Sequence, residues 1–203
     1  MNDSRHAYLS SLESFVAQVG SVPVAELTCP GLGDWDLRSL VGHTSRSLVT
    51  VETYLDQPAE VVEVPTAADY YLQIAATGAA SGDAVVERGR VAGAALGDDP
   101  ARFVRDLATR VRIKLEGYDA TYALSTIAGG MLLGEYLRTR TFELVVHGLD
   151  IGRACGVRPA LGEDALLDAA GLAAEVAVRS GKGPDLLVAL TGRGALPTGF
   201  TVV

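Results

Sequence analysis

The chain has 203 residues, of which 48% are hydrophobic, and its 25 acidic and 17 basic residues give a formal net charge of −8. An acidic protein of this kind repels phosphate backbones, which argues against nucleic acid as a partner. No stretch reaches the roughly 18 uninterrupted apolar residues of a membrane span, so no membrane partner is expected either.

Two further features predict a cytoplasmic protein. The N-terminus, MNDSRHAYLSSLESF, lacks the basic and continuously apolar segments of a signal peptide. Cys29 and Cys155 lie far apart and match no motif spacing, which suits a reducing compartment better than a disulfide framework.

The first part of the chain shows helical periodicity. Residues 3–19 place apolar side chains at spacings of three and four, which predicts an amphipathic helix. The next segment, SVPVAELTCPGLGDW, contains two prolines and two glycines and is predicted as a loop. Asp36 then stands where its carboxylate can accept hydrogen bonds from the free amides of a second helix, which we expect to run to about Leu55.

A short extended linker, EVVEV, follows between two prolines. Beyond it, a third helical region is predicted to begin at Thr66 or Asp69 and to continue towards Leu96. Gly78 and Gly82 weaken the prediction in the middle of this region, because glycine lowers helix stability.

After the turn GDDP, residues 101–116 form another predicted helix with one basic face. That face is interpreted as solvated, with salt bridges to the acidic excess; its members are Arg102, Arg105, Arg110, Arg112 and Lys114. The run TYALSTI, at 121–127, is the only convincing strand pattern before the C-terminus. Gly129-Gly130 follows it and marks its end.

The longest predicted helix runs from about Met131 to Ala154, with Gly156 as a left-handed stop. One more helix, near 163–180, and a short tail complete the chain. This order of predicted helices, with little strand, predicts an all-α fold: a four-helix bundle with an extra C-terminal helix and minor strand content. We expect 1–203 to form a single domain, with the bundle over 1–156 and the helix and tail over 157–203.

The predicted helix from 131 to 154 carries a candidate metal site. Glu143 and His147 lie one turn apart, so both side chains reach the same space. A carboxylate oxygen with an imidazole nitrogen suits Zn²⁺ and also Ni²⁺, Mn²⁺ or Fe²⁺. His43, in the middle of the second helix, is the third candidate ligand, and Asp150 or a nearby hydroxyl is the candidate partner for the second imidazole nitrogen.

Other interpretations remain open from the residues alone. A Glu–His pair at this spacing is commonly a half-buried hydrogen-bonded pair, and His43 by itself suits a core or surface histidine. Arg46 and Arg140, each one turn from a candidate ligand, are candidates for binding a substrate carboxylate, or are solvent-facing or paired arginines. Tyr136 is either a hydrogen-bond donor at the pocket or a core aromatic.

Two stretches resemble a known family. GDWDLRSLVGHTSRSL, with a Trp eight residues before a His, resembles the second helix of the DinB-like metal-binding four-helix bundles. LRTRTFELVVHGLDIGRACG resembles the signature helix of one branch, the mycothiol-dependent maleylpyruvate isomerase N-terminal family of actinobacteria. The resemblance covers most of residues 5–155 and implies a metal held by His43, Glu143 and His147.

The resemblance also implies a function. It predicts a metal-dependent enzyme, with zinc expected, that activates a low-molecular-weight thiol such as mycothiol for S-transfer to, or isomerisation of, a small electrophilic substrate. The isomerase itself has a further C-terminal domain, and residues 157–203 offer one helix and a tail. We therefore expect the fold, the metal and the thiol to carry over rather than maleylpyruvate isomerisation.

Two alternative functions use the same bundle. One is a metal-water hydrolase with the same three ligands. The other is a non-catalytic stress protein that binds a metal or a small molecule, and a purely structural role without metal is a further possibility. Bundles of the family that the chain resembles often form dimers through their helix faces. The expected oligomeric state is therefore a monomer or a homodimer.

Overall fold

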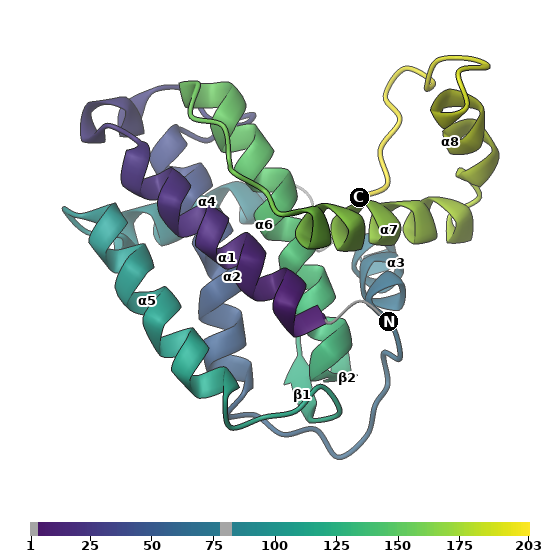
Figure 1. Cartoon of the computed structure of the whole chain (residues 1–203), viewed down its shortest axis with the longest axis horizontal. Helices are drawn as coiled ribbons and strands as arrows, with labels where there is room; N and C mark the ends of the chain where they lie inside the picture. The colour runs from purple at the N-terminus through teal and green to yellow at the C-terminus, as the bar shows by residue number, and fades with distance from the viewer. Residues whose placement is uncertain (1–3, 78–82) are drawn as a thin grey trace.

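The computed structural model describes residues 4–77 and 83–203, and the fold is an all-α bundle, as predicted (Figure 1). The four helices of the bundle are α1 (Ser4–Ser21), α2 (Leu37–Tyr54), α5 (Pro100–Leu115) and α6 (Leu133–Cys155). The other elements are η1 (Val24–Thr28), α3 (Ala67–Thr77), α4 (Asp83–Ala95), α7 (Glu163–Arg179), α8 (Gly183–Leu190), β1 (Ala123–Thr126) and β2 (Gly129–Leu132).

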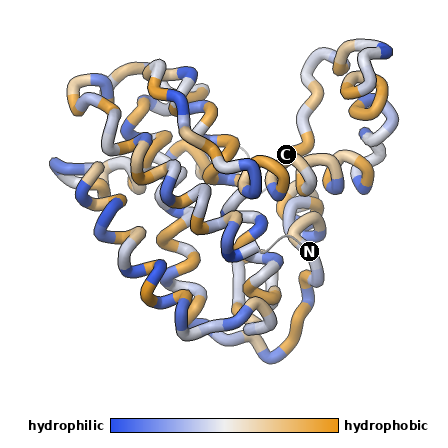
Figure 2. Tube along the Cα trace, viewed as in Figure 1, coloured by the Kyte–Doolittle hydropathy of each residue, from blue (hydrophilic) through white to orange (hydrophobic). Residues whose placement is uncertain are grey.

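The core lies where α1, α2, α5 and α6 face one another. Each of these helices buries apolar side chains on one face, and hydrophobic and hydrophilic positions alternate along them in Figure 2. Both α1 and α2 contact α5 and α6. Among the residues buried between them are Tyr8, Phe15, Leu40, Leu48, Leu107 and Leu137. Packing of α2 against α6 brings residues near 43 beside residues near 143.

The start of α2 follows the predicted capping. The backbone N–H of Ser39 donates to Oδ1 of Asp36 at 2.7 Å, and the helix begins at Leu37. A side-chain cap of this kind stabilises a helix by about 1 kcal/mol. It also fixes the position at which α2 begins, and therefore the face on which His43 stands.

The basic face of α5 forms ion pairs, as predicted from the acidic excess. Arg110 Nε lies 2.7 Å from Glu52 Oε1, and Arg112 pairs with Glu13 at 3.1 Å. These contacts tie α5 to α2 and α1. Because they are exposed, each contributes little to stability.

The prediction of one helical region from residue 66 towards Leu96 was wrong, since α3 and α4 are separate helices. The predicted weak points, Gly78 and Gly82, lie outside the described residues. The physical reason is that the two helices bury their apolar faces against different partners. α3 packs on α6 and α7, whereas α4 packs on α2. One straight helix cannot serve both surfaces.

The strand prediction was correct but incomplete. β1 pairs in antiparallel register with β2, so Gly129 and Gly130 belong to a strand and α6 begins only at Leu133. The linker crosses this hairpin: the backbone N–H of Val64 donates to the carbonyl of Gly130 at 3.0 Å. A Cβ on Gly130 would lie 1.9 Å from the carbonyl oxygen of Val61, so only glycine fits there.

The C-terminal segment holds two helices, where only one was predicted. α7 contacts α1, α3 and α6, and α8 extends away from the bundle (Figure 1). The second helix was missed because its run LLVAL is uniformly apolar and too short to show a period. Pro184, in its first turn, is a compatible starting residue. No helix in the described part of the chain is long and apolar enough to cross a membrane.

Candidate metal centre

Three side chains from two helices meet at one point. His43 comes from the middle of α2, and Glu143 and His147 come from successive turns of α6. One ligand atom from each of the three lies within 4.8 Å of the others. The structure therefore brings together all three residues that the sequence singled out as ligands.

The two ligands on α6 are already paired with each other. His147 Nε2 lies 3.2 Å from Glu143 Oε2, and His147 Nδ1 lies 3.3 Å from Asp150 Oδ2. A carboxylate on the second imidazole nitrogen holds the ring in one orientation, which is common behind metal-binding histidines. The side chains of His147 and Glu143 are 15% and 21% exposed, so the site is partly open to solvent.

Glu143 is oriented by a residue that sequence reasoning did not identify. The hydroxyl of Tyr71, in α3, donates to Glu143 Oε1 at 2.7 Å and also approaches the carbonyl of Thr139 at 3.1 Å. Burial and the neighbouring Glu143 charge raise the pKa of Tyr71 well above its usual value, so the phenol stays protonated and keeps donating. No motif marks Tyr71, because its role depends on how α3 docks on α6.

His43 is held by an aromatic neighbour. Its ring lies 4.5 Å from that of Trp35, whose indole N–H donates to the carbonyl of Val86 at 2.9 Å. His43 Nδ1 is buried and has no hydrogen-bond partner within the described residues. Burial lowers the pKa of His43 to about 4, so the imidazole is neutral at pH 7. A neutral imidazole with an unsatisfied nitrogen fits a ligand for a cation.

The Glu143 carboxylate at the site is ionised, which favours the binding of a cation. Burial alone would raise the pKa of Glu143, but the hydrogen bond and charge of His147 and the charge of Arg140 outweigh it and lower the pKa to about 2. Burial alone would likewise lower the pKa of His147, but its contacts with Asp150 and Glu143 raise it to about 9. His147 is therefore protonated at pH 7 and takes the place of a cation beside Glu143.

A buried arginine lies one turn from this pair. Arg140 is 8% exposed and donates through Nε to Thr139 Oγ1 at 3.0 Å. Its guanidinium carbon lies 5.1 Å from the centre of the Tyr136 ring and 5.5 Å from that of Tyr70, at cation–π distances. No carboxylate in the described part of the chain forms an ion pair with it.

The other two predicted substrate residues differ in their exposure. Tyr136 is 1% exposed and packs against Tyr54 as well as Arg140, so it lies in the core behind the site. Arg46 is half-buried on α2, one turn beyond His43, and forms no ion pair within residues 4–77 and 83–203. Of the predicted substrate residues, Arg46 is the most exposed.

The residues present fit a divalent ion. Two imidazole nitrogens and one carboxylate oxygen are a common donor set for Zn²⁺ and its neighbours, and three protein ligands leave a position for an exogenous group. The family model for the mycothiol maleylpyruvate isomerase N-terminal domain matches residues 8–152, a span that contains all three candidate ligands. No curated protein and no solved structure matches the chain.

Proposed function

Because the chain belongs to the mycothiol maleylpyruvate isomerase N-terminal domain family, we propose that it is a metal-dependent enzyme that activates a low-molecular-weight thiol, with mycothiol as the cosubstrate. The observation that carries this proposal is the convergence of His43, Glu143 and His147 within 4.8 Å at a partly exposed position. The proposed reaction is S-transfer to, or isomerisation of, a small electrophilic substrate.

The proposed metal is zinc, with nickel, manganese and iron as the other ions that suit this donor set. When bound, such an ion supplies Lewis acidity, which ionises a thiol well below its free pKa of about 8.5. His43 and His147 would provide its nitrogen ligands and Glu143 its oxygen ligand.

The surrounding residues keep these ligands in place. Asp150 accepts from His147 Nδ1, which leaves Nε2 directed at Glu143 and the metal position. Tyr71 donates to Glu143 Oε1 and leaves Oε2 beside His147. These partners fix the ring and the carboxylate before a ligand arrives, which reduces the cost of ordering them on binding.

The positive charge near the site supports an anionic substrate or thiolate. Arg46 is the proposed contact for a substrate carboxylate, because the residue is only half-buried. Arg140 lies too deep for that role and contributes its charge from behind Glu143, held between Tyr70 and Tyr136. A fixed guanidinium in a buried position stabilises a developing negative charge more strongly than the same group in water.

The test begins with metal content and continues with activity. Untagged protein is analysed for metals, stripped, reloaded with zinc, and assayed for conjugation of a thiol with 1-chloro-2,4-dinitrobenzene. We expect about one metal per chain and a thiol conjugation rate that depends on the metal and is lost in His147→Ala. His6→Ala, which removes an exposed histidine, is the matched control and should keep both the metal content and the thiol conjugation rate of the wild type.

Other outcomes would point to the alternatives. Hydrolysis of esters or amides without any thiol activity would indicate a metal-water hydrolase. Stoichiometric metal with neither activity would indicate a binding protein. Absence of metal from both the wild type and the reloaded protein would remove the basis of the proposal.

A further inference from the structure

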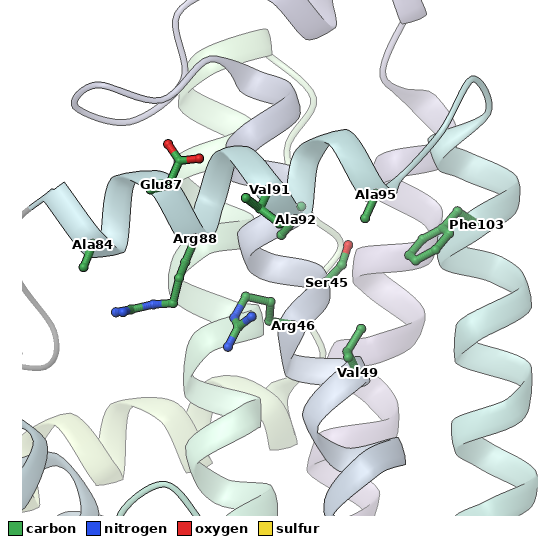
Figure 3. Close-up of a pocket in the computed structure, with 11 residues that line it drawn as sticks. Ser45, Arg46, Val49, Ala84, Glu87, Arg88, Val91, Ala92, Ala95 and Phe103 are labelled. Carbon is green, nitrogen blue, oxygen red and sulfur yellow. The ribbon is translucent and has the colours of Figure 1, made fainter.

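A groove outside the metal centre shares one residue, Arg46, with the chemistry proposed above. It lies between α2, α4 and α5 and has a volume of about 530 Å³ (Figure 3). This is within the usual size range of small-molecule sites, which are mostly apolar with a few placed polar groups. Its lining includes a run of apolar and small side chains, namely Val49, Val91, Ala92, Ala95 and Phe103.

Two walls of the groove, α2 and α4, are in close contact. A Cβ on Gly42 would lie 2.2 Å from the backbone nitrogen of Gly93, so α2 and α4 touch through their backbones. Trp35 and Arg38 bind the carbonyls of Val86 and Gly93 and fasten α4 to the start of α2. The groove is therefore a feature of the helix packing and does not depend on a loop.

The apolar part of the groove is open to solvent. Val91 is 61% exposed although it lines the groove, and the alanines at 92 and 95 are too small to fill the space towards Phe103 (Figure 3). Covering this surface would remove apolar area from water, at roughly 25 cal/mol per Å². The lining therefore favours a ligand with an apolar body.

A positive charge marks one end of the groove. Arg46 and Arg88 lie at the end opposite Phe103, while Glu87 is directed away from Arg46 (Figure 3). Arg46 forms no ion pair with any described carboxylate, although the chain carries a net charge of −8. An arginine left without a counterion in an acidic protein favours an anionic group on the ligand, and its planar fork matches a carboxylate.

We propose that this groove binds an amphipathic carboxylate, with the carboxylate at Arg46 and the apolar body lying along α4 towards Phe103. Arg46 follows His43 by about one helical turn on α2. The carboxylate end of the ligand would therefore lie at the side of the groove nearest the metal centre. The identification of this ligand with the electrophilic substrate rests on the proposed function. The binding of the ligand to the groove does not depend on that function.

The test is calorimetric titration of metal-stripped protein with octanoate and with 1-octanol, which share an apolar chain and differ in charge. Stripping the metal prevents direct coordination of the carboxylate. We expect saturable octanoate binding that weakens at least tenfold in Arg46→Gln, because a charge-assisted contact is lost. Octanol binding should be unchanged in that variant. Ala95→Phe, which fills the groove from an exposed position, should weaken both ligands.

The control is Arg102→Gln, which changes an exposed arginine on α5 that does not line the groove. This variant should bind octanoate as the wild type does. Absence of saturable octanoate binding, or equal binding by wild type, Arg46→Gln and Ala95→Phe, would overturn the inference. Octanoate binding in a protein that fails to hold zinc would overturn the proposed function alone. Zinc binding without octanoate binding would overturn the groove alone.

Discussion

At the scale of single residues, the metal centre depends on how the ligands are oriented as much as on which ligands are present. His147 and Glu143 would pair on any α-helix, because they stand one turn apart. Asp150 on one side and Tyr71 on the other decide which atoms remain available to a cation.

Removing an imidazole ligand should remove most of the metal affinity. His43→Ala and His147→Ala are each expected to weaken zinc binding more than about 100-fold, since loss of a supporting partner alone costs 10–100-fold. Competition with a chromogenic chelator measures the change. His6→Ala, on the surface of α1, should bind zinc like the wild type. Equal affinities in all three variants would refute the ligand assignment.

Asp150→Asn should also weaken zinc binding, but less than the removal of His43 or His147. The amide cannot carry the negative charge that holds and polarises the His147 ring, so zinc affinity is expected to fall by about 10–100-fold. Asp106→Asn, which changes an exposed aspartate on α5, is the matched control. An Asp150→Asn protein with wild-type affinity would show that Asp150 does not support the ligand.

Metal binding should release protons in a predictable way. The pKa of His147 is raised to about 9, whereas those of His43 and Glu143 are about 4 and about 2. At pH 7 only His147 must lose a proton, so binding should release about one proton, and affinity should rise about tenfold per pH unit up to about pH 9. Calorimetry in buffers of different ionisation enthalpy counts the protons, and a count near zero would contradict this assignment.

The same shift affects the metal-free protein. Because the folded pKa of His147 is above its unfolded value of about 6.5, its ion pairs contribute their full stability below that pH. This contribution is lost as the pH rises from about 6.5 to about 9. Zinc replaces the proton, so the loaded protein should not lose stability in this range.

At the scale of helices, the contact of α2 with α4 is the most sensitive packing feature near the site. Gly42→Ala would place a Cβ against the Gly93 backbone. We expect a loss of about 1–3 kcal/mol in the free energy of unfolding, as for other overpacked positions. Gly171→Ala, on the exposed face of α7 with nothing within 4 Å, should instead gain roughly 0.5–1 kcal/mol. Urea unfolding distinguishes the two, and similar changes would contradict the close contact.

The elements that the sequence predicted correctly were those with local signals. Asp36 before an apolar period predicted the start of α2, and the left-handed Gly156 predicted the end of α6. Gly78 and Gly82 weakened the prediction of one helical region from residue 66 towards Leu96, but the division into α3 and α4 depends on which helix each one packs against. The role of Tyr71 was not predictable for the same reason, since 72 residues separate it from Glu143.

At the scale of the whole molecule, a salt-bridge cluster secures the C-terminal helix to the bundle. Arg138 of α6 pairs with Glu135 and Asp168 at 3.1 Å and with Glu175 at 3.5 Å. Glu135 also accepts from the first backbone N–H of α3, which is that of Ala67. One arginine thus joins α6 to α7, while Glu135 joins the same cluster to the helix that carries Tyr71.

The position of the candidate ligands in the chain also has a consequence for hydrogen exchange. A cation held by His43 on α2 and by Glu143 and His147 on α6 would close residues 44–142 into a loop. α3, α4, α5 and the hairpin lie inside this loop, and α8 lies outside it. Openings that separate α2 from α6 must release the cation, so zinc at about 100 times its Kd should slow exchange through those openings roughly 100-fold. Amides of α8 should exchange at the same rate with and without zinc.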